Sequence, residues 1–365
     1  MSKTNNGNIL SHLDVFHFAS IVCVVALAFL YSLDSLPLSM VLLTAVVLGV
    51  AVMTSIHHAE TIAKRVGPSL GTLILAIAVT VIEVGLIVSM MSSATSGGEV
   101  IARDTVFAAV IVVTNGITGF CFLLGGLRHS ELEFKVEGAS SLLAVLAALV
   151  GVTLVLPNFT TTTVGPTYSN AQLIFASCAS VVLYAALVLA QTVTHKDYFA
   201  APVGGANGEG ERPSGMAAVV SGVALIVSLV AVIGLAKTLS PSIESGLAAL
   251  GAPRSSVGIV LALLVLLPEA GAALGAARAN HLQTSLNLAL GSGAASVALT
   301  IPVISVYSMI SGTPVSLGLD AKGLAFLALT FVVSGLTLGT GKTTWLKGVV
   351  HLVILFSYIA LSFMP

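Results

Sequence analysis

Two glutamates lie deep inside long apolar segments, where charged side chains are rare. Glu83 lies within ILAIAVTVIEVGLIVSMM and Glu269 within VGIVLALLVLLPEAGAAL. An ionisable group at the centre of a bilayer costs roughly 2.5 kcal/mol or more, so such a group is usually functional. Desolvation disfavours the charged form of a carboxyl group, so a buried glutamate can hold a proton and release it when a cation binds the same oxygens. The pair therefore indicates an ion and proton site in a membrane transporter, and the alternative is a structural pair with no transport role.

The two glutamate segments look like copies of each other. Each glutamate lies a little past the middle of its apolar stretch, and each begins the pattern Glu-x-Gly. The next apolar stretch contains small and polar residues in both cases, VVTNGITGFCFLLGG after the first and LNLALGSGAASVALTIP after the second. Position and residue type agree, which indicates an internal repeat.

A hard cation would need more oxygen ligands than two carboxylates, since Ca²⁺ takes six to eight of them. The small and polar stretches offer side-chain oxygens from Thr114, Asn115, Thr118, Ser292 and Ser296. Pro268, directly before Glu269, lacks an N–H and frees the carbonyl of Leu264. Other roles remain open for the polar residues: Asn115 could form an interhelical hydrogen bond, and the serines could bond to their own helix.

Composition places the chain in a membrane. Of its 365 residues 56% are hydrophobic and 8% charged, whereas a soluble domain carries about 25% charged residues. The net charge is −1 and no basic stripe is visible, so we expect no nucleic-acid partner. The N-terminal sequence lacks the features of a signal peptide. The chain is expected to be an all-α polytopic protein in the lipid bilayer.

About eleven apolar stretches are long enough to cross the membrane. They cover residues 14–34, 37–56, 69–92, 105–127, 139–157, 170–193, 215–240, 254–277, 281–311, 319–340 and 344–363. The ninth contains Gly291, Gly293 and Pro302, so we expect it to be tilted or broken. His57 and His58 fall just after the second, where we expect a solvated loop.

Lysines and arginines collect in the loops of one side, which predicts that side to be cytoplasmic. These are Lys3, Lys64, Arg65, Arg128, Lys135, Lys196, Arg212, Arg278, Lys342 and Lys347, against Arg103, Lys237, Arg254 and Lys322 on the other side. The N-terminus is then cytoplasmic and the C-terminus outside. Residues 195–214 form a cytoplasmic linker rich in glycine and proline.

Removing the first span leaves five spans on each side of that linker. Because five is odd, the second set must have the opposite membrane orientation, as in the inverted repeats of many secondary transporters. The expected organisation is an N-terminal tail and extra helix (1–36), a first five-helix repeat (37–194), the linker (195–214) and a second repeat (215–365).

A rival interpretation is an intramembrane serine protease that uses Ser292 with His351. It leaves both glutamates without a role, and Gly-Ser-Gly is common in membrane helices. His351 could relay protons, but we expect it to be a packed, hydrogen-bonded histidine. A channel or an organic-solute carrier would not need two titratable groups at the same depth. A passive structural protein would tolerate both Ser292→Ala and Glu83→Gln.

The layout of one extra helix and two five-helix repeats, together with the two glutamate segments and GSGAAS, resembles the calcium/cation antiporter superfamily. Within it the chain is similar to the bacterial ChaA-type calcium (sodium or potassium)/proton antiporters. The resemblance implies that Glu83 and Glu269 bind cation and protons alternately, and that Gly291 and Ser292 match the Gly-Ser of the second repeat. It also implies a bacterial inner membrane, inorganic cations and protons as substrates, no cofactor and no enzyme activity.

The chain departs from the family pattern at several candidate ligands. Thr80 and Leu266 stand where many members have asparagine before the glutamate, and Ala295 replaces a glutamine. The first-copy Gly-Ser is Thr114-Asn115 here. The expected activity is a cation/proton exchange by alternating access, with Ca²⁺ as the first candidate and a sodium or potassium/proton antiporter without Ca²⁺ transport as the alternative.

Overall fold

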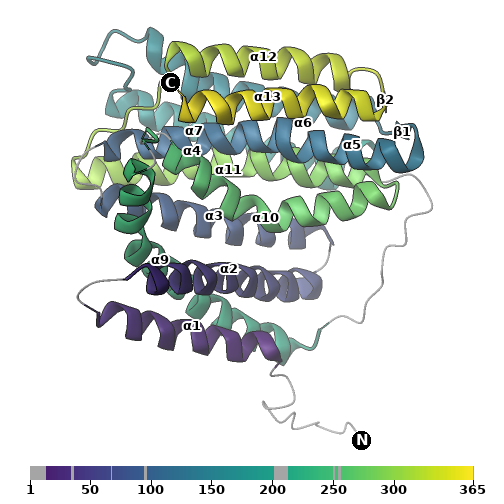
Figure 1. Ribbon diagram of the computed structural model, residues 1–365. Coiled ribbons are helices and arrows are strands. Elements are labelled where there is room, and N and C mark those ends of the chain that lie inside the picture. Colours follow the sequence, from purple (N-terminus) through teal and green to yellow (C-terminus); the bar gives the residue numbers. More distant parts are fainter. Residues whose placement is uncertain are drawn as a thin grey trace, which may run out of the picture. The chain divides into compact units, whose positions relative to one another are not determined.

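The computed structural model describes residues 14–33, 37–66, 68–93, 97–200, 213–249, 251–253 and 256–364, and nearly all of them are helical. Within this part of the chain ten helices are long and apolar enough to span a membrane, and a shorter apolar helix precedes them. The prediction of an all-α polytopic protein with about eleven spans is therefore confirmed. Figure 1 shows the helices, with colours that follow the sequence from purple to yellow.

Several spans join helical segments of different types. The elements are α1 (Val15–Tyr31), α2 (Leu38–Val66), α3 (Pro68–Ser93), α4 (Gly98–Ile111), the π-helix η2 (Val112–Ile117), α5 (Thr118–His129), β1 (Leu132–Glu133), α6 (Val136–Val150), η3 (Gly151–Val155), η4 (Leu156–Phe159), α7 (Asn170–Leu189), η5 (Ala190–Thr194), α8 (Lys196–Phe199), α9 (Gly215–Ala249), α10 (Ser256–Arg278), α11 (Leu282–Ser311), α12 (Ala321–Leu338), β2 (Lys342–Thr343) and α13 (Trp345–Phe363).

The second helix is longer than predicted. It continues to Val66, so His57 and His58 lie in α2 and not in a loop. The His58 side chain is fully buried, and its Nε2 lies 3.1 Å from the hydroxyl of Ser20 on α1. The prediction was wrong because these polar residues have partners on the neighbouring helix.

The ninth predicted span is also continuous. The helix α11 runs through 30 residues and includes Pro302. Of the two alternatives, a tilted or a broken helix, the broken one was wrong, and the tilt stays a prediction. Proline is tolerated in a membrane helix when hydroxyl groups and neighbouring helices satisfy the freed backbone groups. The helix ends at Gly312, whose φ of +67° is costly for any residue with a side chain.

The described chain forms two compact units. Unit 1 holds α1, α2, α3 as far as Ser89 and α9 as far as Ser242, and unit 2 holds the other elements. Each unit takes helices from both predicted repeats, so the compact units cut across the repeats proposed from the sequence. The inverted orientation of those repeats stays a prediction.

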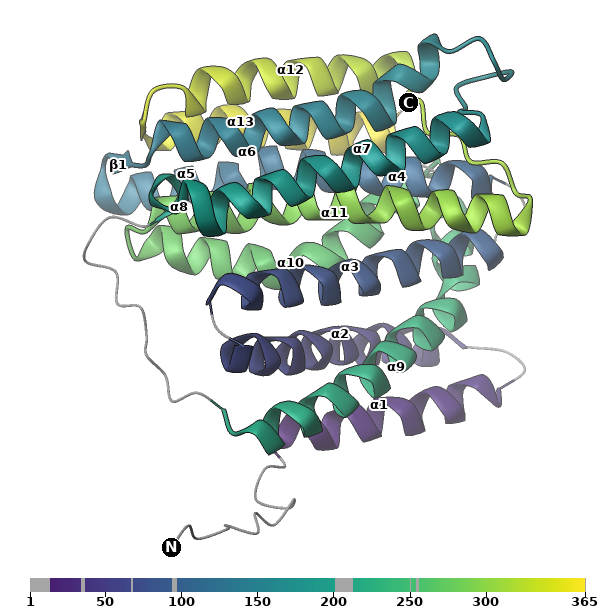
Figure 2. The same ribbon diagram turned by 180° about the vertical axis from the view of Figure 1, so that it is seen from behind.

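Unit 2 is a bundle in which neighbours in space are distant in sequence. The helix α5 packs against α13, α7 against α11, and α10 against both α4 and α11. Figure 2 shows α7 and α11 running side by side. Small residues permit these close contacts. A methyl group added at Gly348 of α13 would lie 2.7 Å from the carbonyl oxygen of Gly119.

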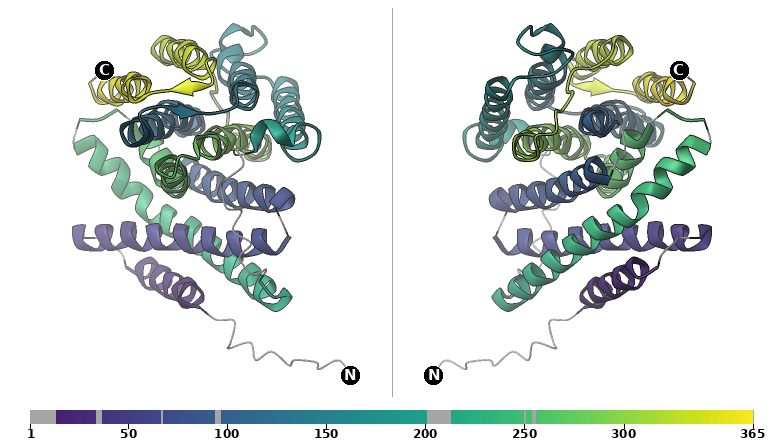
Figure 3. Two further views of the ribbon diagram at one scale, coloured as in Figure 1. Left: turned by 90° about the vertical axis from the view of Figure 1, so that its right-hand side faces the viewer. Right: turned by 90° about the vertical axis from the view of Figure 1, so that its left-hand side faces the viewer.

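At one end of unit 2 the chain reversals are joined by a small antiparallel sheet. Leu132 pairs with Thr343 and Glu133 with Lys342, and the β2 arrow is visible beside the end of α13 in Figure 3. At the same end the ring of His129 lies 2.9 Å from the carbonyl oxygen of Arg278. The basic loops that the sequence assigns to the cytoplasm are thus neighbours in this unit.

Candidate functional site

Glu83 lies on α3 in unit 1. Its side chain is only 4% exposed, and Thr80, one turn earlier, is 6% exposed. The helix α9 approaches α3 closely just after the glutamate, because a methyl group added at Gly85 would lie 2.7 Å from Cγ1 of Ile233. The predicted carboxylate is therefore held in a tightly packed, buried part of the unit.

Glu269 lies on α10 in unit 2, directly after Pro268, and its side chain is partly buried. The helix α10 contacts η2 and α11, which hold the other predicted ligands of this unit. The sequence placed these three segments in one site on the basis of the repeat alone. Their contact within unit 2 agrees with that placement.

The segment with Thr114, Asn115 and Thr118 has a local geometry that the sequence did not predict. Residues 112–117 form a π-helical turn between α4 and α5. The hydroxyl of Thr118 bonds the carbonyl of Val113, five residues back, at 3.0 Å, while Thr114 bonds Val110 at 2.6 Å. Such π-turns inside α-helices occur frequently at functional sites.

Ser292 and Ser296 lie one turn apart on α11. Ser296 is 4% exposed and Ser292 is partly buried. Between them, a methyl group added at Gly293 would lie 3.1 Å from Cγ1 of Val113. The close approach of α11 to η2 therefore occurs at the predicted Gly-Ser segment.

Asn115 on η2 forms side-chain hydrogen bonds with two other helices, α12 and α13. Its Nδ2 donates to the hydroxyl of Thr330 on α12 at 2.9 Å, and its Oδ1 lies 3.1 Å from Nδ1 of His351 on α13. Nε2 of His351 lies 2.8 Å from the hydroxyl of Thr337. The expectation that His351 is a packed, hydrogen-bonded histidine is confirmed. The interhelical role left open for Asn115 is the one observed.

The same contacts exclude a Ser292–His351 dyad in this arrangement. Both ring nitrogens of His351 have partners, and these are Asn115 and Thr337. A serine nucleophile needs a histidine within hydrogen-bond reach to take its proton. His351 is therefore not available as the base that the protease interpretation requires.

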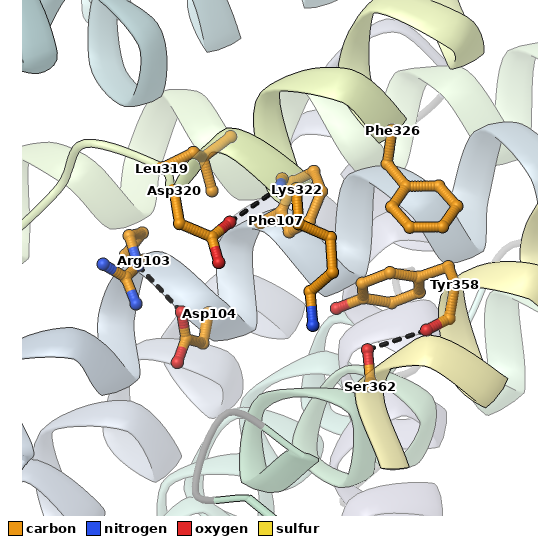
Figure 4. Close-up of a pocket in the computed structure, with 10 residues that line it drawn as sticks. Arg103, Asp104, Phe107, Leu319, Asp320, Lys322, Phe326, Tyr358 and Ser362 are labelled. Atoms are coloured by element: carbon orange, nitrogen blue, oxygen red, sulfur yellow. Dashed lines mark hydrogen bonds and ion pairs between the residues drawn. The ribbon is translucent and has the colours of Figure 1, made fainter. Parts of the chain in front are cut away.

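A small charged pocket lies at the opposite end of unit 2 from the sheet. It is lined by Arg103, Asp104, Asp320, Lys322 and Tyr358 among others, with a volume of about 60 Å³. Nε of Arg103 lies 2.8 Å from Oδ1 of Asp104. Figure 4 shows the Lys322 ammonium group and the Tyr358 hydroxyl directed into the same space. Asp104 is thus paired with a cation, whereas the Lys322 ammonium group donates to the carbonyl oxygen of Leu361 at 2.9 Å. The pocket is large enough to hold water.

Acidic residues that follow α5 form a surface cluster with a lysine of β2. The ammonium group of Lys342 lies 2.9 Å from carboxylate oxygens of both Glu131 and Glu133. Hydrogen bonding and the positive charge of Lys342 lower the pKa of the Glu133 carboxyl, and both glutamates raise the pKa of the lysine. All three side chains are exposed, so their ion pairs contribute little to the stability of the fold.

Sequence reasoning missed a polar cluster in unit 1. Oδ1 of Asp14 lies 2.8 Å from Nδ1 of His17, and its Oδ2 lies 3.0 Å from Nε2 of His57 on α2. Asp14 also caps α1 by accepting from the backbone N–H of Phe16 at 2.9 Å. One carboxylate thus joins the start of α1 to α2. The only sequence signal was a pair of histidines after an apolar run.

This cluster makes the α1–α2 contact sensitive to acid. Burial by itself raises the pKa of the Asp14 carboxyl, but hydrogen bonds from His17 and His57 outweigh it and lower the pKa from 3.8 to about 2. A lowered folded-state pKa means that charged Asp14 stabilises the fold above pH 3.8 and that this contribution is lost as the pH falls through about 2. We expect Asp14→Asn, which keeps the cap, to unfold at a lower temperature than the native protein at pH 7.

The check is thermal unfolding in detergent at a series of pH values. The difference between native protein and Asp14→Asn should shrink as the pH falls towards 2. Asp14→Ala also removes the helix cap and should cost about 1 kcal/mol more. A constant difference across the whole pH range would contradict the charge argument.

Comparison with known proteins gives a consistent set of relatives. The family model described as sodium/calcium exchanger protein matches residues 35–193 and 220–364. These two stretches lie close to the predicted repeats. A protein of Sinorhizobium fredii, named as a candidate ionic transporter, is 43% identical over 94% of both chains. The sodium-potassium/proton antiporter ChaA of Escherichia coli is 30% identical over 84% of both chains.

A third relative is named for a different cation. The Ca²⁺/H⁺ antiporter of Aphanothece halophytica is 26% identical, over 79% of this chain and 80% of its own. Among solved structures, native YfkE superposes with a TM-score of 0.69 at 17% identity, covering 98% of this chain and all of that one. The H⁺/Ca²⁺ exchanger CAX gives 0.66 at 16% identity, covering 98% and 91%. These structures agree with the fold described above.

Proposed function

Because the chain belongs to the sodium/calcium exchanger protein family and is thus a multi-pass cation antiporter, we propose that it exchanges Ca²⁺ for protons across the membrane. Na⁺ or K⁺ is the alternative cation. The single observation that carries the proposal is a glutamate within the second helix of each predicted repeat: Glu83 is buried in α3, and Glu269 is partly buried in α10. Ionisable groups within membrane helices are rare and usually functional.

The two carboxylates provide the coupling. One Ca²⁺ neutralises both charges, and two protons do the same. Cation and protons compete for the same oxygens, so binding of one releases the other. Alternating access then carries the cation out and protons in without a leak. Monovalent cations can exchange by the same competition against one or two protons.

The additional oxygens come from hydroxyl groups in this proposal. Thr114 and Thr118 each donate their hydrogen to a backbone carbonyl, which leaves lone pairs on their oxygens. Ser292 and Ser296 lie on the helix packed against the same turn. We leave Asn115 out of the ligand set, because its Oδ1 is engaged with His351. Because this ligand set has few amide oxygens, Na⁺ and K⁺ remain candidate substrates. One relative is named for these two ions.

We also propose the membrane and orientation predicted from the sequence, a bacterial inner membrane with a cytoplasmic N-terminus and an external C-terminus. The gathering of Arg128, Lys135, Lys196 and Lys342 at one end of unit 2 supports this orientation. Arg103 and Lys322 lie together at the other end.

The test is proton flux in everted membrane vesicles that contain the protein. A pH gradient is established, and CaCl₂, NaCl or KCl is then added. Dissipation by Ca²⁺ alone supports the calcium/proton antiporter, and dissipation by Na⁺ or K⁺ supports the alternative cation. No response to any of the three, with the protein present and correctly inserted, would contradict the proposal. Vesicles from cells without the protein provide the control.

A further inference from the structure

We propose that His351 is a positioning residue for cation binding, which acts through Asn115 on the π-turn η2. The inference rests on the proposed antiport function and adds to it a residue that touches neither cation nor carboxylate. Its basis is a buried hydrogen-bond network that joins η2, α12 and α13.

The network is closed to solvent. His351, Asn115 and Thr330 are each 0% exposed. The His351 ring also packs edge-on against Phe122 of α5, with ring centroids 5.8 Å apart. A buried polar group that loses its partner costs far more than an exposed one, so these bonds are held in place.

Donors and acceptors can be assigned around the ring. Oδ1 of Asn115 can only accept, so Nδ1 of His351 carries a hydrogen and donates to it. Nε2 then accepts from the hydroxyl of Thr337, which shares its single hydrogen with the carbonyl oxygen of Val333 at 2.9 Å. At the other end of the amide, Nδ2 donates to Thr330 at 2.9 Å and to Thr114 at 3.2 Å. A neutral ring with hydrogen on Nδ1 gives both ring nitrogens a partner, and this tautomer is assigned from the network.

Asn115 thereby links the π-turn to α12 and α13, which pack on one side of it. On that side, a methyl group added at Gly116 would lie 3.3 Å from the Leu355 side chain, and one at Gly119 would lie 3.0 Å from Cβ of His351. On the opposite side Val113 meets α11 at Gly293, next to Ser292. The turn is therefore packed between α13 and α11.

A change at residue 351 can be transmitted through this packing. Interiors packed at this density pass displacements on to the next layer rather than absorb them. A π-turn also carries one more residue per turn than an α-turn needs, so it can relax towards α-helix when a restraint is lost. Relaxation would move Thr118 and the surface facing α10 and α11. The expected consequence is weaker cation binding.

The test uses two variants that separate the nitrogens of the ring. His351→Asn keeps an amide N–H near the position of Nδ1 and can still donate to Asn115. His351→Gln places its amide near Nε2, towards Thr337, and loses the bond to Asn115. We expect His351→Gln to raise the KM for the cation roughly tenfold, since a buried amide oxygen is left unsatisfied. His351→Asn should remain within about twofold of native, and kcat should change less than KM.

Thr330→Val is a second route to the same result, with a side chain of the same shape. It removes the acceptor at the other end of Asn115 and should also raise the KM. A binding measurement accompanies transport: the cation concentration that protects the purified protein from thermal unfolding should rise in parallel with the KM. Agreement of the two readouts separates positioning from a general loss of folded protein.

The outcomes are distinct. An unchanged KM in both His351→Gln and Thr330→Val, with native protein exchanging cations, would overturn this inference alone. An equal loss of kcat in His351→Gln and His351→Asn, without a change of KM, would show a structural role and also overturn it. Absence of exchange by the native protein would overturn the proposed function and this inference with it.

Discussion

Replacing either Glu83 or Glu269 with glutamine should abolish cation-dependent proton flux in everted vesicles. Glutamine keeps the shape and polarity of glutamate but can neither carry a negative charge nor exchange a proton. Removing one charged partner from a buried site costs roughly 3 kcal/mol or more, which corresponds to a loss of about a hundredfold or greater in affinity. The measurement is the initial rate of gradient dissipation at saturating cation.

The matched control is Glu137→Gln, the same chemical change at an exposed position on α6. It should leave the rate within about twofold of native, as surface substitutions generally do. Glu83→Asp and Glu269→Asp retain the charge on a shorter side chain and should keep part of the activity. Substantial exchange in Glu83→Gln would contradict the paired-carboxylate mechanism. Loss in only one of the two glutamine variants would reduce the site to a single carboxylate.

Adding one methyl group at Gly348 should destabilise the protein severely. The Cβ of Gly348→Ala would meet the backbone of α5 itself, 2.7 Å from the oxygen of Gly119 and 2.9 Å from Cα of Leu123. Helix backbone cannot move aside as a flexible side chain can, so α13 must shift away from α5. Overpacking of this kind typically costs about 1–3 kcal/mol. The measurement is thermal unfolding together with the yield of monodisperse protein in detergent.

Gly335→Ala on the adjacent α12 is the control for Gly348→Ala. A methyl group there meets nothing within 4 Å, and alanine is the better helix former by up to about 1 kcal/mol. Its stability should equal or exceed that of the native protein. Equal stability of both alanine variants would show that α5 and α13 are packed less closely than described.

The membrane class and the number of spans could be predicted from the sequence. The role of the two glutamates within apolar helices as the ion site stays a prediction. Hydropathy adds along the chain, and a charged residue within an apolar run is visible without any knowledge of its neighbours. For the candidate ligands, the sequence indicated the segments that contain them but not the role of each residue. Thr114, Thr118 and Ser296 lie in elements that pack together in unit 2, but sequence alone could not distinguish a ligand from a hydrogen-bonded link at Asn115.

What the sequence by itself determined is therefore local: which stretches are apolar enough to span, and which side chains are too costly to be there without a use. Only the tertiary structure decided the partners of the buried polar groups. Asn115 and His351 are 236 positions apart, and Asp14 and His57 are 43 apart. Contacts with α1 likewise explain why α2 continues through His57 and His58. A buried hydrogen bond depends on geometry between distant segments, and no local pattern of residues encodes that geometry.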